Sequence, residues 1–322
     1  MKIGLIDIDY NGQFPNIAQM KIAAYHKAKG DDVDWYMPFN DRYDIVYISK
    51  VFTFSPDIED CINANRVVRG GTGYAIRLIN GIETYDPQYD KPLPPEIEHI
   101  FPDYSIYKPE LTGNTAYGFL TRGCPRGCNF CHVAPKEGKR SIKVADVSEF
   151  WNGQKRLVLC DPNILACAEW ESLFKQIAAT HAIVNFNQGL DVRLLTPEKI
   201  ELINKLKFED IHFAWDRYDD KDIVLPKFKM YSEMAKYRPH GALAGVYTLT
   251  NYDTTFDQDL ERVYILRDLG YEPYIMIYDK QHADHKYTLL QNWVNNRIIW
   301  AKCARFEDYD HTRSIKANKT RK

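Results

Sequence analysis

Short apolar runs bounded by Gly, Pro or Asn alternate along the chain with stretches whose apolar residues recur every three or four positions. Residues 2–8 are apolar on both faces, which is typical of a buried strand in a parallel sheet. A turn at Asn11-Gly12 follows, and Pro15 stands near the start of a helix that ends near Gly30. Further strands are predicted at 33–36, 44–51 and 66–68. This order predicts an open α/β sheet of Rossmann type over residues 1–90.

A proline-rich passage, residues 91–115, is predicted to be a linker or a wrapping segment, because prolines interrupt both helices and strand ladders. Strand and helix then alternate, with strands predicted at 117–121, 156–160, 182–187, 210–215, 242–249 and 272–277. Helices are predicted between them at 168–180, 197–206 and 258–269. Six such units are too few for a closed eight-stranded barrel and fit a partial (β/α)6 barrel of TIM type over residues 116–285. Residues 286–322 are predicted to form one helix, 286–303, and a basic tail.

Composition narrows the class of protein. The chain has 322 residues, 45% of them hydrophobic and 27% charged, which excludes wholesale disorder. No apolar run approaches the ~18–20 residues of a membrane span, and acidic residues within the first ten positions argue against a secretory signal, so we expect a cytoplasmic protein. A net charge of −2 argues against a protein whose whole surface binds nucleic acid, although it permits a local basic patch. The tail, which carries basic residues and no acid after position 311, is either a solvated end or a contact for nucleic acid.

Three of the seven cysteines fall within eight residues, which suits a metal or redox cluster better than a disulfide framework. Cys124, Cys128 and Cys131 follow a predicted strand with the spacing C-x3-C-x2-C. Glycines between them let the backbone curl, so three thiolates can converge on one centre. A 4Fe–4S cluster has four irons, and three local cysteines leave one iron open. The alternative is a zinc site completed by His132 or a distant cysteine.

This loop, with the aromatic Phe130 before the third cysteine, resembles the signature of the radical SAM superfamily, and the resemblance covers residues 116–285. It implies that Cys124, Cys128 and Cys131 hold a 4Fe–4S cluster whose open iron is chelated by S-adenosylmethionine. One electron, from a donor such as flavodoxin or ferredoxin, then yields methionine and a 5′-deoxyadenosyl radical. That radical abstracts hydrogen from a substrate that the sequence does not identify.

The resemblance also implies that polar residues at the strand ends contact S-adenosylmethionine, together with Phe130. Asp161 and Asn163 resemble the turn near the methionine amino group, with a helix N-cap as the alternative. Gln188 and Arg193 are similar in place to groups that contact the ribose and the carboxylate. Residues 250–253 are expected on the adenine side.

Two further residues at strand ends are candidates. Asp216 stands where members of the family carry a carboxylate for the ribose hydroxyls. Cys160 ends a predicted strand and is a candidate catalytic thiol, although free cysteines are often small buried hydrophobes.

The first 90 residues resemble the cobalamin-binding domain of one radical SAM subgroup, in element order and in the Gly70-Gly71 turn. Domains that ligate cobalt use the histidine of a D-x-H-x-x-G loop, whereas residues 7–12 place Asp9 at that position. His26, inside the predicted helix, is expected at the surface. Three options follow: cobalamin without a protein ligand, a domain that binds substrate, or no cofactor. The alternative functions are cobalamin-dependent methyl transfer and, from a different class, a zinc-stabilised nucleic-acid-binding module.

Overall fold

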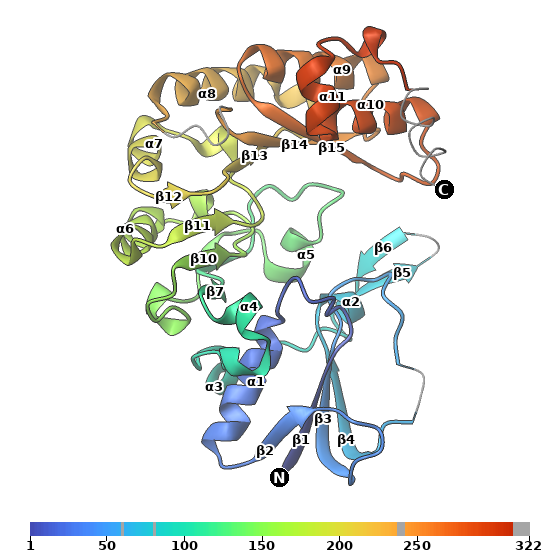
Figure 1. Cartoon of the computed structure of the whole chain (residues 1–322), viewed down its shortest axis with the longest axis vertical. Coiled ribbons are helices and arrows are strands. Elements are labelled where there is room, and N and C mark those ends of the chain that lie inside the picture. Colours follow the sequence, from blue (N-terminus) through green and yellow to red (C-terminus); the bar gives the residue numbers. More distant parts are fainter. Residues whose placement is uncertain (59–60, 80–81, 237–241, 312–322) are drawn as a thin grey trace. The chain divides into compact units, whose positions relative to one another are not determined.

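The computed structural model describes residues 1–58, 61–79, 82–236 and 242–311. It shows a mixed α/β chain with several parallel sheets (Figure 1), which confirms the predicted α/β class. The chain divides into two compact units, Met1–Asn187 and Gln188–Lys322, and each is described by itself. The predicted domain boundaries at residues 90, 116 and 285 stay predictions.

The first unit opens with a parallel sheet whose strand order is β2-β1-β3-β4. Its strands are β1 (Lys2–Asp7), β2 (Asp32–Trp35), β3 (Tyr43–Ser49) and β4 (Ala64–Gly70). Helix α1 (Ile17–Ala28) is capped by Asn16, whose side chain accepts a hydrogen bond from the Gln19 amide. Ile22 and Ala23 of α1 pack against Ile3 and Leu5 of β1. Apolar residues of β2 and β3 pack against the same core, which is why apolar runs predicted these strands.

Two features of this region differ from the sequence-based expectation. His26 is buried rather than exposed, with Nδ1 2.7 Å from Asp31 Oδ2 and Nε2 3.1 Å from the Tyr47 hydroxyl. Two ring partners satisfy both nitrogens, which removes the cost of burying a polar side chain. After α2 (Thr72–Ala75), an antiparallel hairpin that was not predicted is formed by β5 (Ile76–Ile79) and β6 (Ile82–Tyr85).

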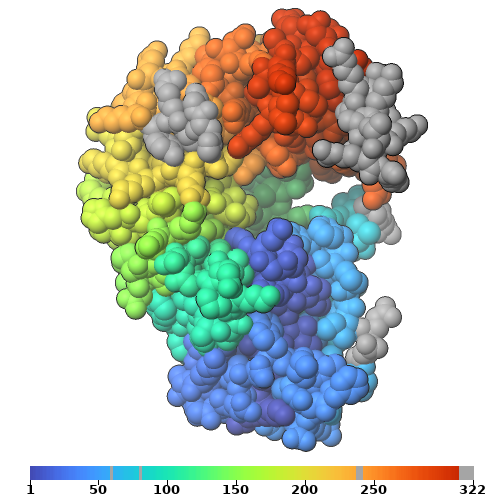
Figure 2. Space-filling model, in the orientation of Figure 1, coloured from blue at the N-terminus to red at the C-terminus, as the bar shows by residue number. Residues whose placement is uncertain are grey.

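The proline-rich passage folds into three short helical turns, and the first two pack against residues of the first sheet. The three turns are α3 (Pro95–Glu98), η1 (Tyr104–Ile106) and α4 (Pro109–Thr112). Ile97 joins the core of Ile3 and Leu5, and Trp35 Nε1 donates to the Ile106 carbonyl at 2.9 Å. In Figure 2 this passage lies directly against the N-terminal residues.

The rest of the first unit contains three neighbouring parallel strands. They are β7 (Thr115–Gly118), β10 (Arg156–Leu159) and β11 (Ile183–Phe186), with β10 between the other two. Helix α6 (Trp170–Thr180) connects β10 to β11. Between β7 and β10 lie β8 (Thr121–Arg122), α5 (Val133–Glu137), β9 (Ile142–Lys143) and η2 (Val147–Glu149). The turn η3 (Ile164–Ala166) follows β10.

The second unit has a parallel sheet in the order β13-β14-β15. Its strands are β13 (His212–Ala214), β14 (Gly245–Thr250) and β15 (Glu272–Ile277), and a short strand, β12 (Lys207–Phe208), precedes them. Its first helical elements are η4 (Val192–Leu194), α7 (Pro197–Ile203), η5 (Tyr218–Asp220), α8 (Lys221–Met234) and α9 (Phe256–Asp268). Helix α8 was not predicted, because it is polar and carries Pro226 inside.

The predicted single helix at 286–303 is wrong. The structure has two helices, α10 (His285–Asn295) and α11 (Arg297–Lys302), followed by η7 (Phe306–Asp308). Asn296 between them is extended (φ −91°, ψ 105°), and its side chain accepts hydrogen bonds from the Ile298 and Ile299 amides. Residues 312–322, which hold most of the basic tail, lie outside the described residues. None of the helices in the described ranges has the length and apolar character that crossing a bilayer requires.

Candidate metal and cofactor site

The cysteine loop projects from the antiparallel pair β8–β9, directly after β7. Glu137, at the end of α5, closes the base of the loop: its two oxygens accept from Arg122 Nη1 (2.9 Å) and from the Gly123 amide (3.2 Å). The Cys124 amide donates to the Gly138 carbonyl at 3.1 Å. These bonds close the base of the loop that carries the three thiols.

Two glycines are required by the path of this loop. Gly123 has a φ of +83°, and a Cβ there would lie 2.2 Å from the Arg140 carbonyl oxygen, so no side chain fits. Gly127 has a φ of +59° with open space around it. The turn that follows Gly127 is closed by a 3.0 Å bond from the Cys131 amide to the Cys128 carbonyl. The backbone therefore curls at these glycines, as the sequence predicted.

Asp161, immediately beyond β10, anchors the start of the cysteine loop. It is 3% exposed, and its Oδ1 accepts from the Leu120 amide (3.1 Å) and the Thr121 hydroxyl (2.7 Å). Its Oδ2 is buried and has no hydrogen-bond partner among the described residues. Burial raises the pKa of this carboxyl to about 6, although the Thr121 and Leu120 bonds and the charge of Arg122 act in the opposite direction. A buried carboxylate with one vacant oxygen has the chemistry to accept a hydrogen bond from an amino group.

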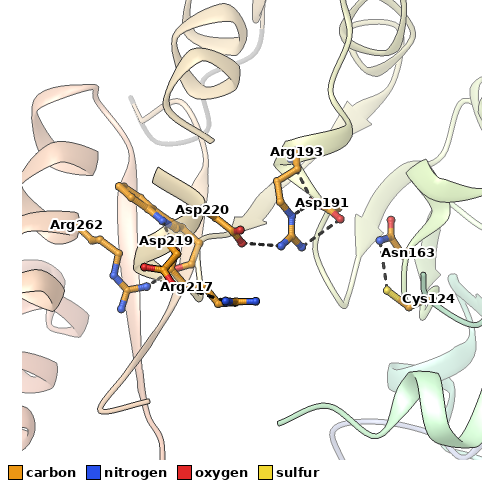
Figure 3. Close-up of polar contacts among 9 residues, drawn as sticks. Cys124, Asn163, Asp191, Arg193, Arg217, Asp219, Asp220 and Arg262 are labelled. Carbon is orange, nitrogen blue, oxygen red and sulfur yellow. Dashed lines mark hydrogen bonds and ion pairs between the residues drawn. The ribbon is translucent and has the colours of Figure 1, made fainter. Parts of the chain in front are cut away.

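Asn163 joins the same turn to the first cysteine. Its Nδ2 lies 3.5 Å from Cys124 Sγ, as Figure 3 shows. In the part of the chain that the structure describes, the Asn163 side chain makes no capping bond to η3. The Asp161 oxygen bonds to residues 120 and 121 rather than to η3. The helix N-cap, which was the alternative for these two residues, is therefore not what the structure shows.

The donor set on the loop consists of three thiols, all partly exposed. Thiolates are the ligands of iron–sulfur clusters, and three of them leave one iron of a 4Fe–4S cluster open, so the donor chemistry fits. Among the described residues, however, no group of three or more His, Cys, Asp or Glu side chains has the arrangement that would hold a metal ion. What the structure provides is one anchored loop that carries all three thiols.

In the second unit, Arg193 bridges two carboxylates. Its Nε lies 2.7 Å from Asp191 Oδ1, and its Nη1 lies 2.8 Å from Asp220 Oδ2 (Figure 3). Burial alone would lower the pKa of Arg193, but its bonds and attraction to Asp191 and Asp220 outweigh burial and raise it. Much of the donor capacity of Arg193 is therefore directed at protein carboxylates, so its predicted contact with a cofactor would use the donors that remain.

Asp216 follows β13 beside a fully buried ion pair. Arg262 and Asp259 of α9 are both unexposed, and Arg262 Nη2 lies 2.5 Å from Asp259 Oδ1 and 2.6 Å from the Leu249 carbonyl. Arg262 Nη1 also donates to the Trp215 carbonyl, so the pair joins the carboxyl ends of β13 and β14. Asp216 Oδ1 has no partner within the described ranges. Burial raises its pKa, and the charge of Arg262 partly offsets this rise.

The remaining candidates are placed as follows. Gln188 is exposed at the end of β11, and Phe130 is half-buried in the cysteine loop. Residues 250–253 follow β14, and Asn251 there has a φ of +61° while its amide donates to Asp259 Oδ2 at 3.0 Å. Cys160 is buried, and burial, with the charge of Asp161 second, raises the pKa of its thiol to about 12. A thiol that is protonated at neutral pH favours the alternative of a buried hydrophobe over a catalytic role.

The sequence did not predict the residues that anchor the cysteine loop and the strand ends, as distinct from the residues expected to contact a cofactor. Glu137 carried no signal, because its partners are defined only when the loop closes. The Asp259–Arg262 pair shows the i,i+3 spacing of a helical ion pair, but that spacing is more common on exposed faces, and only the structure reveals its burial.

Comparisons with known proteins do not assign the chain to a family. No protein-family model matches the chain, and no curated protein matches it significantly.

Proposed function

We propose that this protein is a radical SAM enzyme in which Cys124, Cys128 and Cys131 hold a 4Fe–4S cluster. The observation that carries the proposal is the anchored loop with three thiols, which follows β7 and β8 and is joined to the end of the neighbouring strand β10 by Asp161 and Asn163. When bound, such a cluster supplies the electron that cleaves S-adenosylmethionine to methionine and a 5′-deoxyadenosyl radical. The substrate from which hydrogen is then abstracted is not specified by these residues.

The residues of the chain have separate tasks in this proposal. Asp161 Oδ2, buried and with no partner among the described residues, accepts a hydrogen bond from the methionine amino group. Asn163, through its bond to Cys124, orients the first thiol of the loop. In the second unit, Asp216 accepts hydrogen bonds from the ribose hydroxyls. The Asp259–Arg262 pair fixes the backbone at Trp215, the residue before it.

The proposal includes a finer description of the fold. The strands β7, β10, β11, β13, β14 and β15 would form one partial (β/α)6 barrel, preceded by a Rossmann-like domain. Its support is that each set of three strands is parallel and that helices separate most of the successive strands. The order β2-β1-β3-β4 supports the Rossmann-like description.

The alternatives have less support. The zinc interpretation needs a fourth ligand, and His132 Nε2 lies 3.2 Å from Glu83 Oε2 rather than beside a thiol. For cobalamin, Asp9 stands at the position of the cobalt-ligating histidine. Both of its oxygens accept hydrogen bonds, from the Val51 amide and the Ser55 hydroxyl. A visible spectrum after reconstitution with cobalamin tests methyl transfer separately.

Anaerobic reconstitution with iron and sulfide tests the proposal. We expect about four irons per chain and, with a reductant, formation of 5′-deoxyadenosine from S-adenosylmethionine. Cys124→Ser should lose both, whereas the matched control Cys303→Ser should retain both. A folded wild-type protein that binds zinc and no iron would contradict the proposal, and so would a cluster that survives in Cys124→Ser.

A further inference from the structure

A cavity of about 690 Å³ lies in the first unit, where β1 and β2 end, and it is lined by none of the residues proposed for the cluster or for S-adenosylmethionine. Its volume is in the range of small-molecule sites. Leu5, Ile6 and Asp7 come from the carboxyl end of β1, and Trp35 comes from that of the neighbouring β2. In open parallel sheets, ligands bind outside the carboxyl ends of the strands, which is where this cavity lies.

Aromatic rings form one wall of this cavity. Tyr10 and Trp35 are nearly parallel, with an interplanar angle of 8° and centroids 6.5 Å apart, and Tyr107 meets both rings edgewise or tilted. Trp35 is fixed by the bond from its Nε1 to the Ile106 carbonyl. Rings held in this way are pre-organised to contact a flat ligand without further loss of side-chain entropy.

A carboxylate supplies the specific polar group. Asp7, the last residue of β1, lines the cavity, and its Oδ2 accepts from the Tyr107 hydroxyl at 2.6 Å. That hydroxyl in turn accepts from the Asn16 amide at 3.0 Å, which fixes the orientation of the carboxylate. Asp7 is half-buried; burial raises its pKa, and hydrogen bonds from the side chains of Tyr107 and Asn16 partly offset this rise. Lys108, exposed, lies at the same cavity.

We propose that this cavity binds a free purine nucleotide whose base presents an N–H donor edge, as guanine does. The aromatic wall contacts the face of the base, and the Asp7 carboxylate accepts from its ring N–H and exocyclic amino group. Guanine presents two adjacent donors, which pair with the two oxygens of a carboxylate. Adenine presents a ring nitrogen acceptor beside its amino group, so one carboxylate oxygen would face another acceptor. Lys108 supplies the positive charge for the phosphate. The site is independent of the cluster and of its proposed chemistry.

Calorimetric titration of the full-length chain with GMP, IMP and AMP, at mildly alkaline pH, tests this assignment. We expect affinity to fall in that order, with GMP at least about tenfold tighter than AMP, because AMP cannot donate a second hydrogen bond to the charged carboxylate. Asp7→Asn should remove the preference for GMP over AMP. The matched control Asp32→Asn, at an exposed position of β2, should keep it.

Lys108→Ala provides a second test that does not depend on the fold tolerating a change at Asp7. It should weaken GMP severalfold and leave guanosine unchanged. Equal binding of GMP and AMP, no binding of either, or a GMP preference that persists in Asp7→Asn would overturn the proposal. A competition experiment with single-stranded RNA that contains unpaired guanine tests the source of the base. If the RNA binds more tightly than GMP and displaces it, the ligand is a polymer and the proposed free nucleotide is wrong.

Discussion

Replacing Asp161 by asparagine separates the charge of this carboxyl from its hydrogen bonds. The introduced amide would still offer its oxygen to the Thr121 hydroxyl and the Leu120 amide, but it carries no charge. The folded-state pKa of Asp161 is about 6 against an ordinary value of 3.8, a rise of about two pKa units. At about 1.4 kcal/mol per unit, the buried charge lowers the free energy of unfolding of the wild type by about 3 kcal/mol.

The sign of the pH dependence follows from this rise. Between about pH 4 and pH 6 the folded state retains a proton that the unfolded state has lost, so the wild type loses stability as pH rises through this window. The penalty is complete above about pH 6. Any cost of burying the amide of Asp161→Asn does not depend on pH, so it cancels when the difference between variant and wild type is compared across pH.

Urea unfolding of the metal-free protein across this pH range measures the difference. The free energy of unfolding of Asp161→Asn minus that of the wild type should rise by about 2.4 kcal/mol between pH 4 and pH 7. The control Asp32→Asn, at an exposed site, should show a nearly constant difference. A constant difference for Asp161→Asn, or one that falls with pH, would refute the reasoning that the charge is desolvated.

The same variant tests the proposed contact with the methionine amino group. Reconstituted Asp161→Asn should retain its iron yet bind S-adenosylmethionine at least about tenfold more weakly, because the charged acceptor is gone. Unchanged affinity would assign Asp161 to holding residues 120 and 121 alone.

Three other substitutions probe the supporting structure. Arg262→Met leaves the buried Asp259 charge without its partner and should cost about 3–5 kcal/mol in urea unfolding; a cost below about 1 kcal/mol would show that the pair is not buried as described. Glu137→Gln should loosen the base of the cysteine loop and increase the rate at which Cys124 reacts with a thiol reagent, and an unchanged rate would contradict the anchoring role. Asn296→Ala removes the cap of α11 and should cost about 1 kcal/mol, visible as a lower thermal midpoint; no change would mean that the helix break does not depend on this side chain.

The strands were predictable wherever an apolar run is buried in a sheet. Residues 156–160 and 272–277 were identified in this way, because β10 and β15 each bury alternate side chains. Periodicity failed at 286–303, since apolar spacing continues through Asn296 while the backbone does not. Helix α8 was missed because its polar surface and Pro226 conceal its buried face.

In the candidate site, the three proposed cysteine ligands were predictable from the sequence, whereas the hydrogen bonds that anchor their loop were not. The spacing of Cys124, Cys128 and Cys131 is local, and the two glycines with positive φ lie where the sequence predicted a curled loop. Asp161 was a candidate from its position at a strand end, yet its bonds to Leu120 and Thr121 join segments far apart in the chain. Such pairings depend on the neighbouring positions of β7 and β10, which no local pattern encodes.

The most direct test of the central claim is electron paramagnetic resonance of the reduced, reconstituted protein with S-adenosylmethionine labelled with ¹⁵N at its amino group. If the three cysteines leave one iron open, the spectrum should change on addition of the labelled molecule, and a coupling between the cluster and the ¹⁵N nucleus should appear. A cluster whose spectrum is unaffected, with no nitrogen coupling, would mean that a fourth ligand closes that iron and that the radical mechanism is wrong.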